Sequence, residues 1–306
     1  MKKVLIATEK PFASEALKKI SKVILKAGHE VCLLEGYRSK DELTGAMAGV
    51  HALIVRSDII DAEVMAAAPD LEIVVRAGAG YDNVDCGYAH KHQIVVMNTP
   101  GQNANAVAEL AIGLAIYGSR EMFSGKMGRE LRQRTLGLHG FGYVARNVFR
   151  IARSLGMKVI VYTRHSREAA AAIGLKVAHS LEDLYSRCDV VSIHVPARGE
   201  HIGSVSYPVL RELKKGAIII NTARKEVVNE DDLIRFMEGR TDVKYLTDVE
   251  PAQKERFVEK FPDRFYATPK KMGAQTAEAN ANAGLAAAEQ IIEFFRTGDT
   301  TFQVNR

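Results

Sequence analysis

The sequence predicts an α/β protein made of two domains, each built on a parallel sheet, with a cleft between them. Short runs rich in valine and isoleucine alternate with longer amphipathic stretches along the chain, as in parallel sheets covered by helices on both faces. A glycine-rich turn follows one of these runs and opens a helix. The length of 306 residues is about twice that of a usual domain, which favours two domains over one.

The first hundred residues contain five short apolar runs that we expect to be strands. The expected strands cover 3–8, 29–34, 51–56, 71–78 and 93–98. Between the first two, residues 12–28 place apolar side chains at steps of three and four and end on glycine, which predicts an amphipathic helix. This order of strand, helix and strand indicates a parallel sheet.

A second set of apolar runs follows a long alanine- and leucine-rich helix expected over 103–123. The expected strands of this set cover 135–140, 158–163, 174–179, 189–195, 217–223 and 244–249, with strand-like residues at 265–269. The last long helix is expected over 277–299, and we expect it to pack on the first domain. The predicted domains are therefore residues 1–99 plus 277–306, and residues 100–276.

Composition narrows the class of protein further. The net charge of +5 is spread along the chain without a dense basic tract, which favours anionic small molecules over nucleic acid as partners. Cys32, Cys86 and Cys188 are odd in number and lack metal-ligand spacing, so we expect reduced thiols and no metal. No apolar run approaches the roughly 18 residues needed to cross a bilayer. We therefore expect a cytoplasmic protein without membrane contact.

The glycine-rich turn has the pattern of a dinucleotide-binding site. Gly140 and Gly142 would allow a tight turn and close approach of a pyrophosphate to the backbone, and the small Ala145 would let helix and strand pack closely. The first helical residues, including Tyr143 and Val144, would face the diphosphate. The alternative is a tight turn between strand and helix that binds no ligand.

The choice between NAD and NADP depends on the end of the next strand. An acidic residue commonly stands there to bind the ribose 2′-hydroxyl of NAD, but here the strand ends at Thr163 and Arg164. Because no carboxylate would repel a 2′-phosphate and a guanidinium could bind it, NADP is permitted or favoured. The alternative is that Arg164 lies solvated at the adenosine edge while NAD is used.

Four stretches in order resemble the D-2-hydroxyacid dehydrogenase family. They are VVRAGAGYDNVD at 74–85, the glycine turn, IIINTARKEVVNEDDL at 218–233 and YLTDVEP at 245–251. The resemblance covers essentially the whole chain and is strongest to the short D-3-phosphoglycerate dehydrogenases. It implies a flavodoxin-like substrate domain beside a Rossmann domain. The chain ends at FQVNR, so we expect no C-terminal serine-sensing domain.

The resemblance implies residues that hold the reacting end of the substrate. Arg224 of the NTAR motif would fix the substrate carboxylate and carbonyl, since a guanidinium can bind a 2-oxo acid through two parallel hydrogen bonds. The loop of Ala77, Gly78 and Ala79 would bind the carboxylate through backbone amides, and its small residues permit that approach. The alternative for Arg224 is a structural role at a strand end.

The resemblance also points to Arg56 and Arg76 for a phosphate group on the substrate. Both follow apolar runs, and ligands of open α/β sheets bind beyond the carboxyl ends of the strands. Two arginines there suit a phosphorylated acid better than a plain one. For each residue alone, a solvated surface charge is the alternative.

Asp248 matches the family aspartate that contacts the nicotinamide carboxamide, and the sequence departs from the family pattern just after it. The family glutamate that orients the catalytic histidine stands several residues after this aspartate, before a proline. Here Glu250 and Pro251 follow almost at once. Glu250 is therefore a candidate for the orienting role whose position is in question.

The largest departure concerns the proton carrier. Where the family has a histidine after Thr-Pro, this chain reads TPKKMGAQT from Thr268, so a lysine takes the place of the histidine. Alignment from Thr268 selects Lys270, and alignment from Gly273 selects Lys271. We favour Lys270, because the preceding strand fixes the direction of the first side chain. The alternative is that both lysines are surface charges.

Together these residues predict a D-3-phosphoglycerate dehydrogenase that uses NAD or NADP and serves serine biosynthesis. One alternative is an NADPH-dependent glyoxylate or hydroxypyruvate reductase. Another is a dinucleotide-sensing protein without turnover, because the family histidine is missing and the glutamate is displaced. The wide apolar face of the helix at 103–123 predicts a homodimer through the central domain, as in the family.

Overall fold

The computed structural model describes all 306 residues, and they form two compact units. The first unit contains residues 1–103 and 275–306, and the second contains residues 104–274. The sequence places these boundaries at 99 and 276. Both units are α/β, and all strand pairs within their sheets are parallel, which confirms the predicted fold class.

The first unit is built on a five-stranded sheet in the order β2-β1-β3-β4-β5, which is the flavodoxin-like order. Its strands are β1 (Lys3–Thr8), β2 (Glu30–Glu35), β3 (Ala52–Val55), β4 (Ile73–Arg76) and β5 (Val95–Asn98). All four residues of β3 are buried, because helices cover both faces of the sheet.

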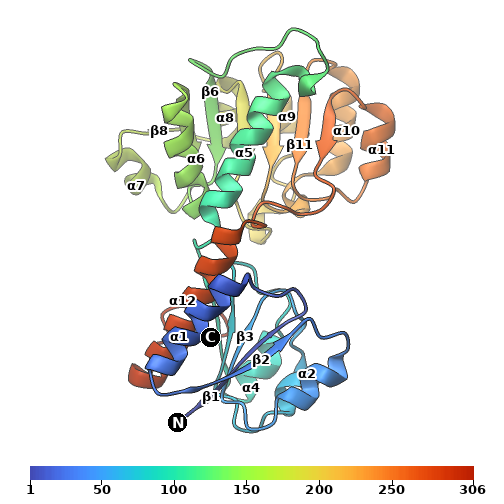
Figure 1. The fold of residues 1–306 in the computed structure, drawn as a ribbon. Coiled ribbons are helices and arrows are strands. Elements are labelled where there is room, and N and C mark those ends of the chain that lie inside the picture. The colour runs from blue at the N-terminus through green and yellow to red at the C-terminus, as the bar shows by residue number, and fades with distance from the viewer. The chain divides into compact units, whose positions relative to one another are not determined.

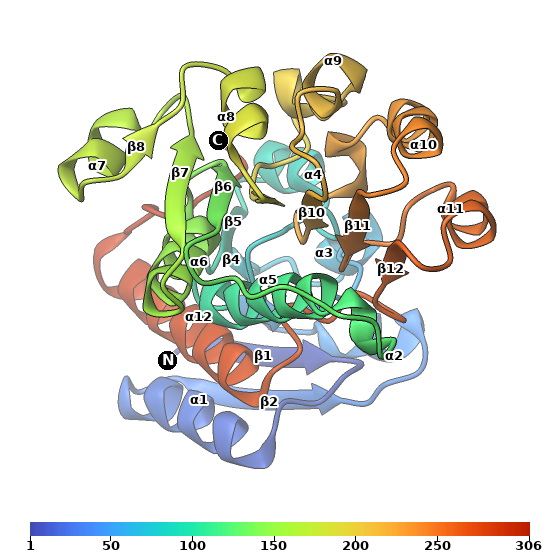
Figure 2. The same ribbon diagram turned by 90° about the horizontal axis from the view of Figure 1, so that it is seen from above.

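Five helices belong to the first unit. They are α1 (Ser14–Lys26), α2 (Lys40–Ala46), α3 (Ala62–Ala66), α4 (Cys86–Lys91) and α12 (Ala277–Thr297). The last helix lies alongside α1, far from it in sequence (Figures 1 and 2). Gly284 allows the close approach, because a Cβ there would lie 2.4 Å from Cδ1 of Ile20. Capping by Thr276 and the left-handed Gly298 fix the ends of α12.

The second unit is built on a seven-stranded sheet in the order β12-β11-β10-β9-β6-β7-β8. Its strands are β6 (Thr135–His139), β7 (Lys158–Tyr162), β8 (Lys176–Val177), β9 (Val190–Ile193), β10 (Ile218–Asn221), β11 (Lys244–Thr247) and β12 (Phe265–Ala267). Successive strands run outward from β6 on one side and outward from β9 on the other, so the connections change side between these two strands. Doubly wound sheets bind dinucleotides at this point.

The helices of the second unit cover both faces of its sheet, with α5 and α6 side by side on one of them (Figure 1). The α-helices are α5 (Ala104–Ser119), α6 (Tyr143–Ser154), α7 (Arg167–Ala172), α8 (Leu181–Arg187), α9 (Tyr207–Leu210), α10 (Glu230–Gly239) and α11 (Lys254–Lys260). The 3-10 turns are η1 (Glu121–Phe123), η2 (Gly199–His201) and η3 (Lys225–Val227). No helix in either unit is long and apolar enough to span a bilayer.

Helix α5 ends at Ser119, so the predicted extension to residue 123 is wrong. Glu121, Met122 and Phe123 have φ angles of 53°, 52° and 57°, which a right-handed helix does not contain. The carboxylate of Glu121 instead meets the buried ammonium of Lys244 at 2.9 Å. Because a buried charge needs a partner, this ion pair favours the turn over continued helix.

Candidate active site

The candidate phosphate-binding arginines lie at one edge of the first sheet. Arg76 is the last residue of β4, and Arg56 directly follows β3. The two strands pair in a register that sets Val55 opposite Arg76, so both arginines leave neighbouring strands at their carboxyl ends. This is the edge at which open α/β sheets bind ligands.

The guanidinium of Arg56 is held by uncharged groups. It donates to the carbonyl oxygen of Lys10 at 2.7 Å and to Oδ1 of Asn280 at 2.5 Å, and it lies 5.2 Å from the ring centre of Phe12. Burial lowers the pKa of Arg56, and the nearby Asp58 acts in the opposite direction. Since arginine stays protonated in proteins, these contacts fix the position of its charge without cancelling it.

Asp58 joins the loops at this edge, and sequence reasoning missed it. Its carboxylate accepts hydrogen bonds from the amide of Glu9 at 2.7 Å, the hydroxyl of Tyr37 at 2.8 Å and the amide of Arg56 at 2.9 Å. Its carbonyl oxygen accepts from Nδ2 of Asn83 at 2.6 Å. Burial, reinforced by the bond to Asp58, raises the pKa of Tyr37. Asp58 is 3% exposed and therefore acts as an internal anchor.

The small-residue loop after β4 offers fewer open amides than the sequence predicts. The amide of Ala77 donates to the carbonyl of Val55 at 2.8 Å, and that of Gly78 donates to the carbonyl of Arg76 at 2.8 Å. The amide of Ala79 has no acceptor in the protein. Gly78 has a φ of 150°, and a Cβ there would lie 1.4 Å from Nη1 of Arg76. Glycine therefore lets the arginine cross the loop, and Ala79 is the amide best suited to a carboxylate.

The glycine turn of the second unit has the form that a diphosphate needs. Gly140 has a φ of 103°, and a Cβ there would lie 2.7 Å from the carbonyl oxygen of His194. Gly142 is the N-cap of α6, and a Cβ there would meet no atom within 4 Å. The first turn of α6, which includes Tyr143 and Val144, has no side-chain cap and no acidic residue. Its amides and dipole can therefore bind an anion.

Two histidines, the buried His139 and the half-buried His194, lie beside this turn and were not anticipated from the sequence. His139 ends β6, and His194 follows β9, the neighbouring strand. Burial lowers the pKa of each to about 3, so both are neutral at physiological pH. The Nε2 atoms of both are buried without a partner. The histidines can therefore offer hydrogen bonds to a ligand at the strand ends without adding charge.

At the end of β7, Thr163 is buried and Arg164 is exposed. Arg164 forms an ion pair with Glu200, which lies on the turn η2 after β9. Its Nε also lies 3.5 Å from the hydroxyl of Tyr162. The guanidinium that the sequence offers to a 2′-phosphate is therefore bound to a carboxylate from another loop.

Arg224 follows β10 and is positioned by Asn221, another residue missed in the sequence. Asn221 is fully buried; its side chain accepts from the amide of Ala223 at 3.0 Å and donates to the carbonyl of Arg224 at 3.0 Å. The guanidinium donates to the carbonyl of Ala223 at 3.0 Å. Because the backbone on both sides is fixed by one amide side chain, Arg224 leaves the strand end in a defined direction.

Asp248 anchors the loop that carries the two candidate lysines. Its carboxylate is 2% exposed and accepts from the hydroxyl of Thr268 at 2.9 Å and from the amides of Met272 and Gly273 at 2.7 and 2.8 Å. These bonds hold the loop on either side of Lys270 and Lys271. Three of the roughly four acceptor sites of a carboxylate are thus used within the protein, which leaves little for a nicotinamide carboxamide.

We expect Asp248→Asn to loosen this loop. Asparagine would place an NH₂ group, which is a donor, where a carboxylate oxygen now accepts from a backbone N–H. Losing such a buried hydrogen bond costs about 1–3 kcal/mol. Local opening should then expose the peptide bonds after Lys270 and Lys271, and trypsin should cut there about tenfold faster. Timed digestion followed by mass spectrometry measures this rate. Asp263→Asn, at an exposed carboxylate, serves as the matched control, and equal cleavage of both variants would contradict the anchoring role.

Lys270 and Lys271 both have exposed side chains. Glu250 is exposed and pairs with Lys254 at 2.8 Å, one turn later along the chain. Lys254 is therefore a charged partner of Glu250 in the structure, and the orienting role of Glu250 stays a prediction.

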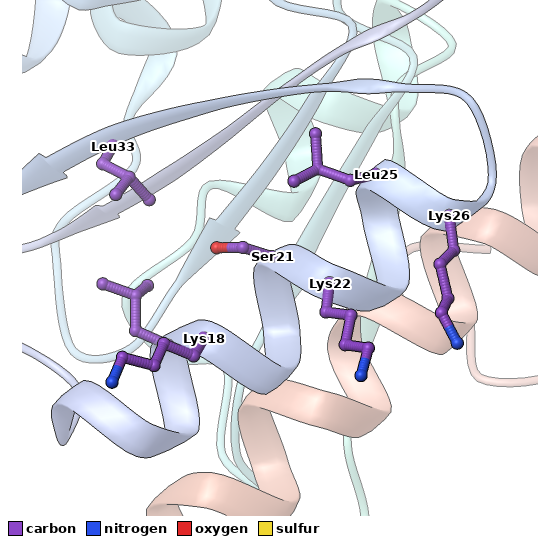
Figure 3. Close-up of a pocket in the computed structure, with 7 residues that line it drawn as sticks. Lys18, Ser21, Lys22, Leu25, Lys26 and Leu33 are labelled. Carbon is purple, nitrogen blue, oxygen red and sulfur yellow. The ribbon is translucent and has the colours of Figure 1, made fainter.

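A hollow on the surface of the first unit is unrelated to these residues. It has a volume of about 640 Å³ and is lined by α1 and β2, including Leu25 and Leu33 with lysines Lys18, Lys22 and Lys26 around them (Figure 3). It contains none of the predicted site residues. The functional candidates instead lie at strand ends in both units.

The first sheet carries arginines at its carboxyl edge, and the second carries a glycine turn suited to a diphosphate. These features are typical of a two-domain dinucleotide-binding protein. Residues 117–270 match the family described as D-isomer specific 2-hydroxyacid dehydrogenase, NAD binding domain. A hydroxypyruvate reductase from Thermotoga maritima is 33% identical over 298 residues, covering 92% of this chain and 96% of the relative. The chain belongs to the D-isomer specific 2-hydroxyacid dehydrogenase family.

Other relatives carry a more specific name. A D-3-phosphoglycerate dehydrogenase from Archaeoglobus fulgidus is 34% identical over 308 residues, covering 95% of this chain. This chain spans 56% of that relative's length and 58% of the corresponding human protein's. The structure of NAD⁺-bound 3-phosphoglycerate dehydrogenase from Entamoeba histolytica has a TM-score of 0.87 and 45% identity, covering 100% of this chain and 99% of that one.

Proposed function

We propose that the protein is a D-3-phosphoglycerate dehydrogenase. It would oxidise the C2 hydroxyl of 3-phosphoglycerate to the ketone of 3-phosphohydroxypyruvate, the first committed step of serine synthesis. The observation that carries the proposal is the pair Arg56 and Arg76, which leave adjacent strands at the same sheet edge. The relatives named as phosphoglycerate dehydrogenases, and the similar structure from Entamoeba, support the same substrate.

The residues of the second unit suggest how the reaction proceeds. A bound nicotinamide would supply the hydride acceptor for C2. Arg224 would hold the substrate carboxylate and stabilise negative charge on the C2 oxygen, while the amide of Ala79 contributes to carboxylate binding. A lysine of the loop held by Asp248, Lys270 in our assignment, would take the hydroxyl proton during oxidation and return it during reduction.

The cofactor would lie along the strand ends of the second sheet. Gly140, Gly142 and the first turn of α6 would hold the diphosphate, and Thr163 and Arg164 would lie near the adenosine ribose. The family match and the NAD⁺-bound relative support NAD. The lack of an acid at the end of β7 still permits NADP, and the pairing of Arg164 with Glu200 weighs against it.

The second candidate is an NADPH-dependent glyoxylate or hydroxypyruvate reductase, which the Thermotoga relative's name favours. The test compares kcat/KM for phosphohydroxypyruvate and hydroxypyruvate. Two guanidinium contacts to phosphate, at about 1.5–3 kcal/mol each, predict a preference of at least about 100-fold for the phosphorylated acid. Arg56→Gln and Arg76→Gln should each reduce this preference, whereas Arg38→Gln, at an exposed arginine of the same unit, should not. Equal rates on both acids would favour the reductase.

A third candidate, a dinucleotide-sensing protein, would bind the cofactor and turn over neither acid. The same assay separates it from both enzymes once cofactor binding has been measured by calorimetry. Binding without turnover of any 2-hydroxy or 2-oxo acid would favour the sensor.

Exposed apolar side chains of the second unit support the proposed assembly. We infer a homodimer through the second unit, because Ile116, Phe123 and Met127 are 38%, 69% and 96% exposed in and just after α5. Light scattering of the purified protein measures its mass in solution.

The three cysteines are free thiols, which supports a reducing compartment such as the cytoplasm.

A further inference from the structure

The ion pair between Arg164 and Glu200 joins two loops at the edge where the adenosine ribose of a dinucleotide would lie. Strands β7 and β9 flank β6 in the sheet, so the loops after them emerge on either side of the end of β6. The two side chains are 50% and 52% exposed. Exposed pairs of this kind contribute about 0–1 kcal/mol to folding, so the fold itself gains little from this contact.

The surroundings of the pair are mainly basic. Four titratable neighbours shift the pKa of the half-buried His201, and these are Glu200, Arg164, Arg198 and His165. Burial lowers the pKa of His201; Arg164, Arg198 and His165 lower it further, and Glu200 alone opposes them. Without Glu200 this corner would present two guanidinium groups and two imidazoles, which is a suitable environment for a phosphate.

We propose that Glu200 is a specificity-determining residue that selects NAD over NADP. In many dinucleotide sites an acid at the end of the second strand binds the ribose 2′-hydroxyl. Here Thr163 stands there and is buried, and Glu200 supplies a carboxylate at the same edge from the loop after β9. It can accept a hydrogen bond from a 2′-hydroxyl, and it occupies the guanidinium that a 2′-phosphate would need.

A 2′-phosphate and a 2′-hydroxyl differ chiefly in charge. A 2′-phosphate carries roughly two negative charges at neutral pH, so placing it beside Glu200 creates repulsion and displaces the existing partner of Arg164. A 2′-hydroxyl meets neither penalty. This inference rests on the cofactor use proposed above, but it does not depend on which acid is the substrate.

The test uses the adenosine end of the cofactor alone. Calorimetry gives the dissociation constants of 5′-AMP and 2′,5′-ADP for the wild type and for Glu200→Gln. We expect the wild type to favour 5′-AMP. The variant should gain about tenfold or more in affinity for 2′,5′-ADP relative to 5′-AMP, since a freed guanidinium can form charge-assisted bonds to phosphate. Adding Arg164→Gln to the variant should remove the gain. Titrations with NADH and NADPH should shift in the same direction.

Glu168→Gln provides the matched control, because it removes the same charge from an exposed carboxylate in the first turn of α7. An equal gain in Glu168→Gln would assign the effect to net charge and overturn the proposal. So would an unchanged ratio in Glu200→Gln, or a wild type that already favours 2′,5′-ADP. Because no substrate is used, failure of the proposed dehydrogenase activity would leave these binding results unaffected.

Discussion

Replacing Arg224 with alanine should lower kcat/KM for phosphohydroxypyruvate by about 10³-fold or more. The side chain is proposed both to bind the substrate carboxylate and to stabilise charge on the C2 oxygen, and a single oxyanion donor is commonly worth about 10²–10³-fold in rate. Its loss should not affect diphosphate binding, because that depends on the glycine turn and the first turn of α6. The NADH dissociation constant should therefore stay within about twofold of wild type.

Two further variants make the Arg224 experiment specific. Lys225→Ala changes the next residue along, which is exposed, and should leave turnover near the wild-type value. Arg224→Lys keeps the charge but loses the two parallel hydrogen bonds, so most of the activity should still be lost. Wild-type turnover in Arg224→Ala would remove this residue from the mechanism, and the arginine would then have only a structural role at the end of β10.

Replacing Lys270 with alanine should lower kcat by about 10²–10⁴-fold, the usual contribution of a general acid or base. Strand β12 pairs with β11 as far as Ala267, and Thr268 is bonded to Asp248, so the direction of the chain entering Lys270 is fixed. Lys271→Ala is the matched control, since the two lysines are adjacent and both exposed. Steady-state rates in both directions, together with NADH binding, separate loss of chemistry from loss of cofactor.

The outcome identifies the proton carrier. A collapse confined to Lys270→Ala would support our alignment from Thr268, and a collapse confined to Lys271→Ala would transfer the role to its neighbour. If both variants keep wild-type rates, the lysines are surface charges, and water or another group carries the proton. A partial rate recovered with added primary amines would support an amine base directly.

The positions of the strands followed from the sequence because strand residues are identified locally. The run KVLIAT predicts a strand over 3–8, and β1 covers these residues. Its side chains are nearly all buried, so hydrophobicity and β-branching point to the same structure. The end of α5 could not be found in this way, since it depends on the ion pair between Glu121 and Lys244, which are 123 residues apart.

The contacts of the site residues were harder to predict than the residues themselves. Asp248 was expected to contact the cofactor, yet its carboxylate is bonded to groups 20 to 25 residues later in the chain. Arg164 was expected to be available for a phosphate, yet Glu200 binds it from a loop two strands later. Such pairings depend on which loops the sheet order brings together, and periodicity within one segment contains no information about them.

Asp58 has a consequence for the motions of the first unit. This one carboxyl-bearing residue is bonded to segments that follow β1, β2, β3 and β4, through Glu9, Tyr37, Arg56 and Asn83. A loop that opens on its own must take a hydrogen bond away from the buried Asp58, which is costly. We therefore expect the loops that surround the proposed phosphate site to open together as one cooperative unit.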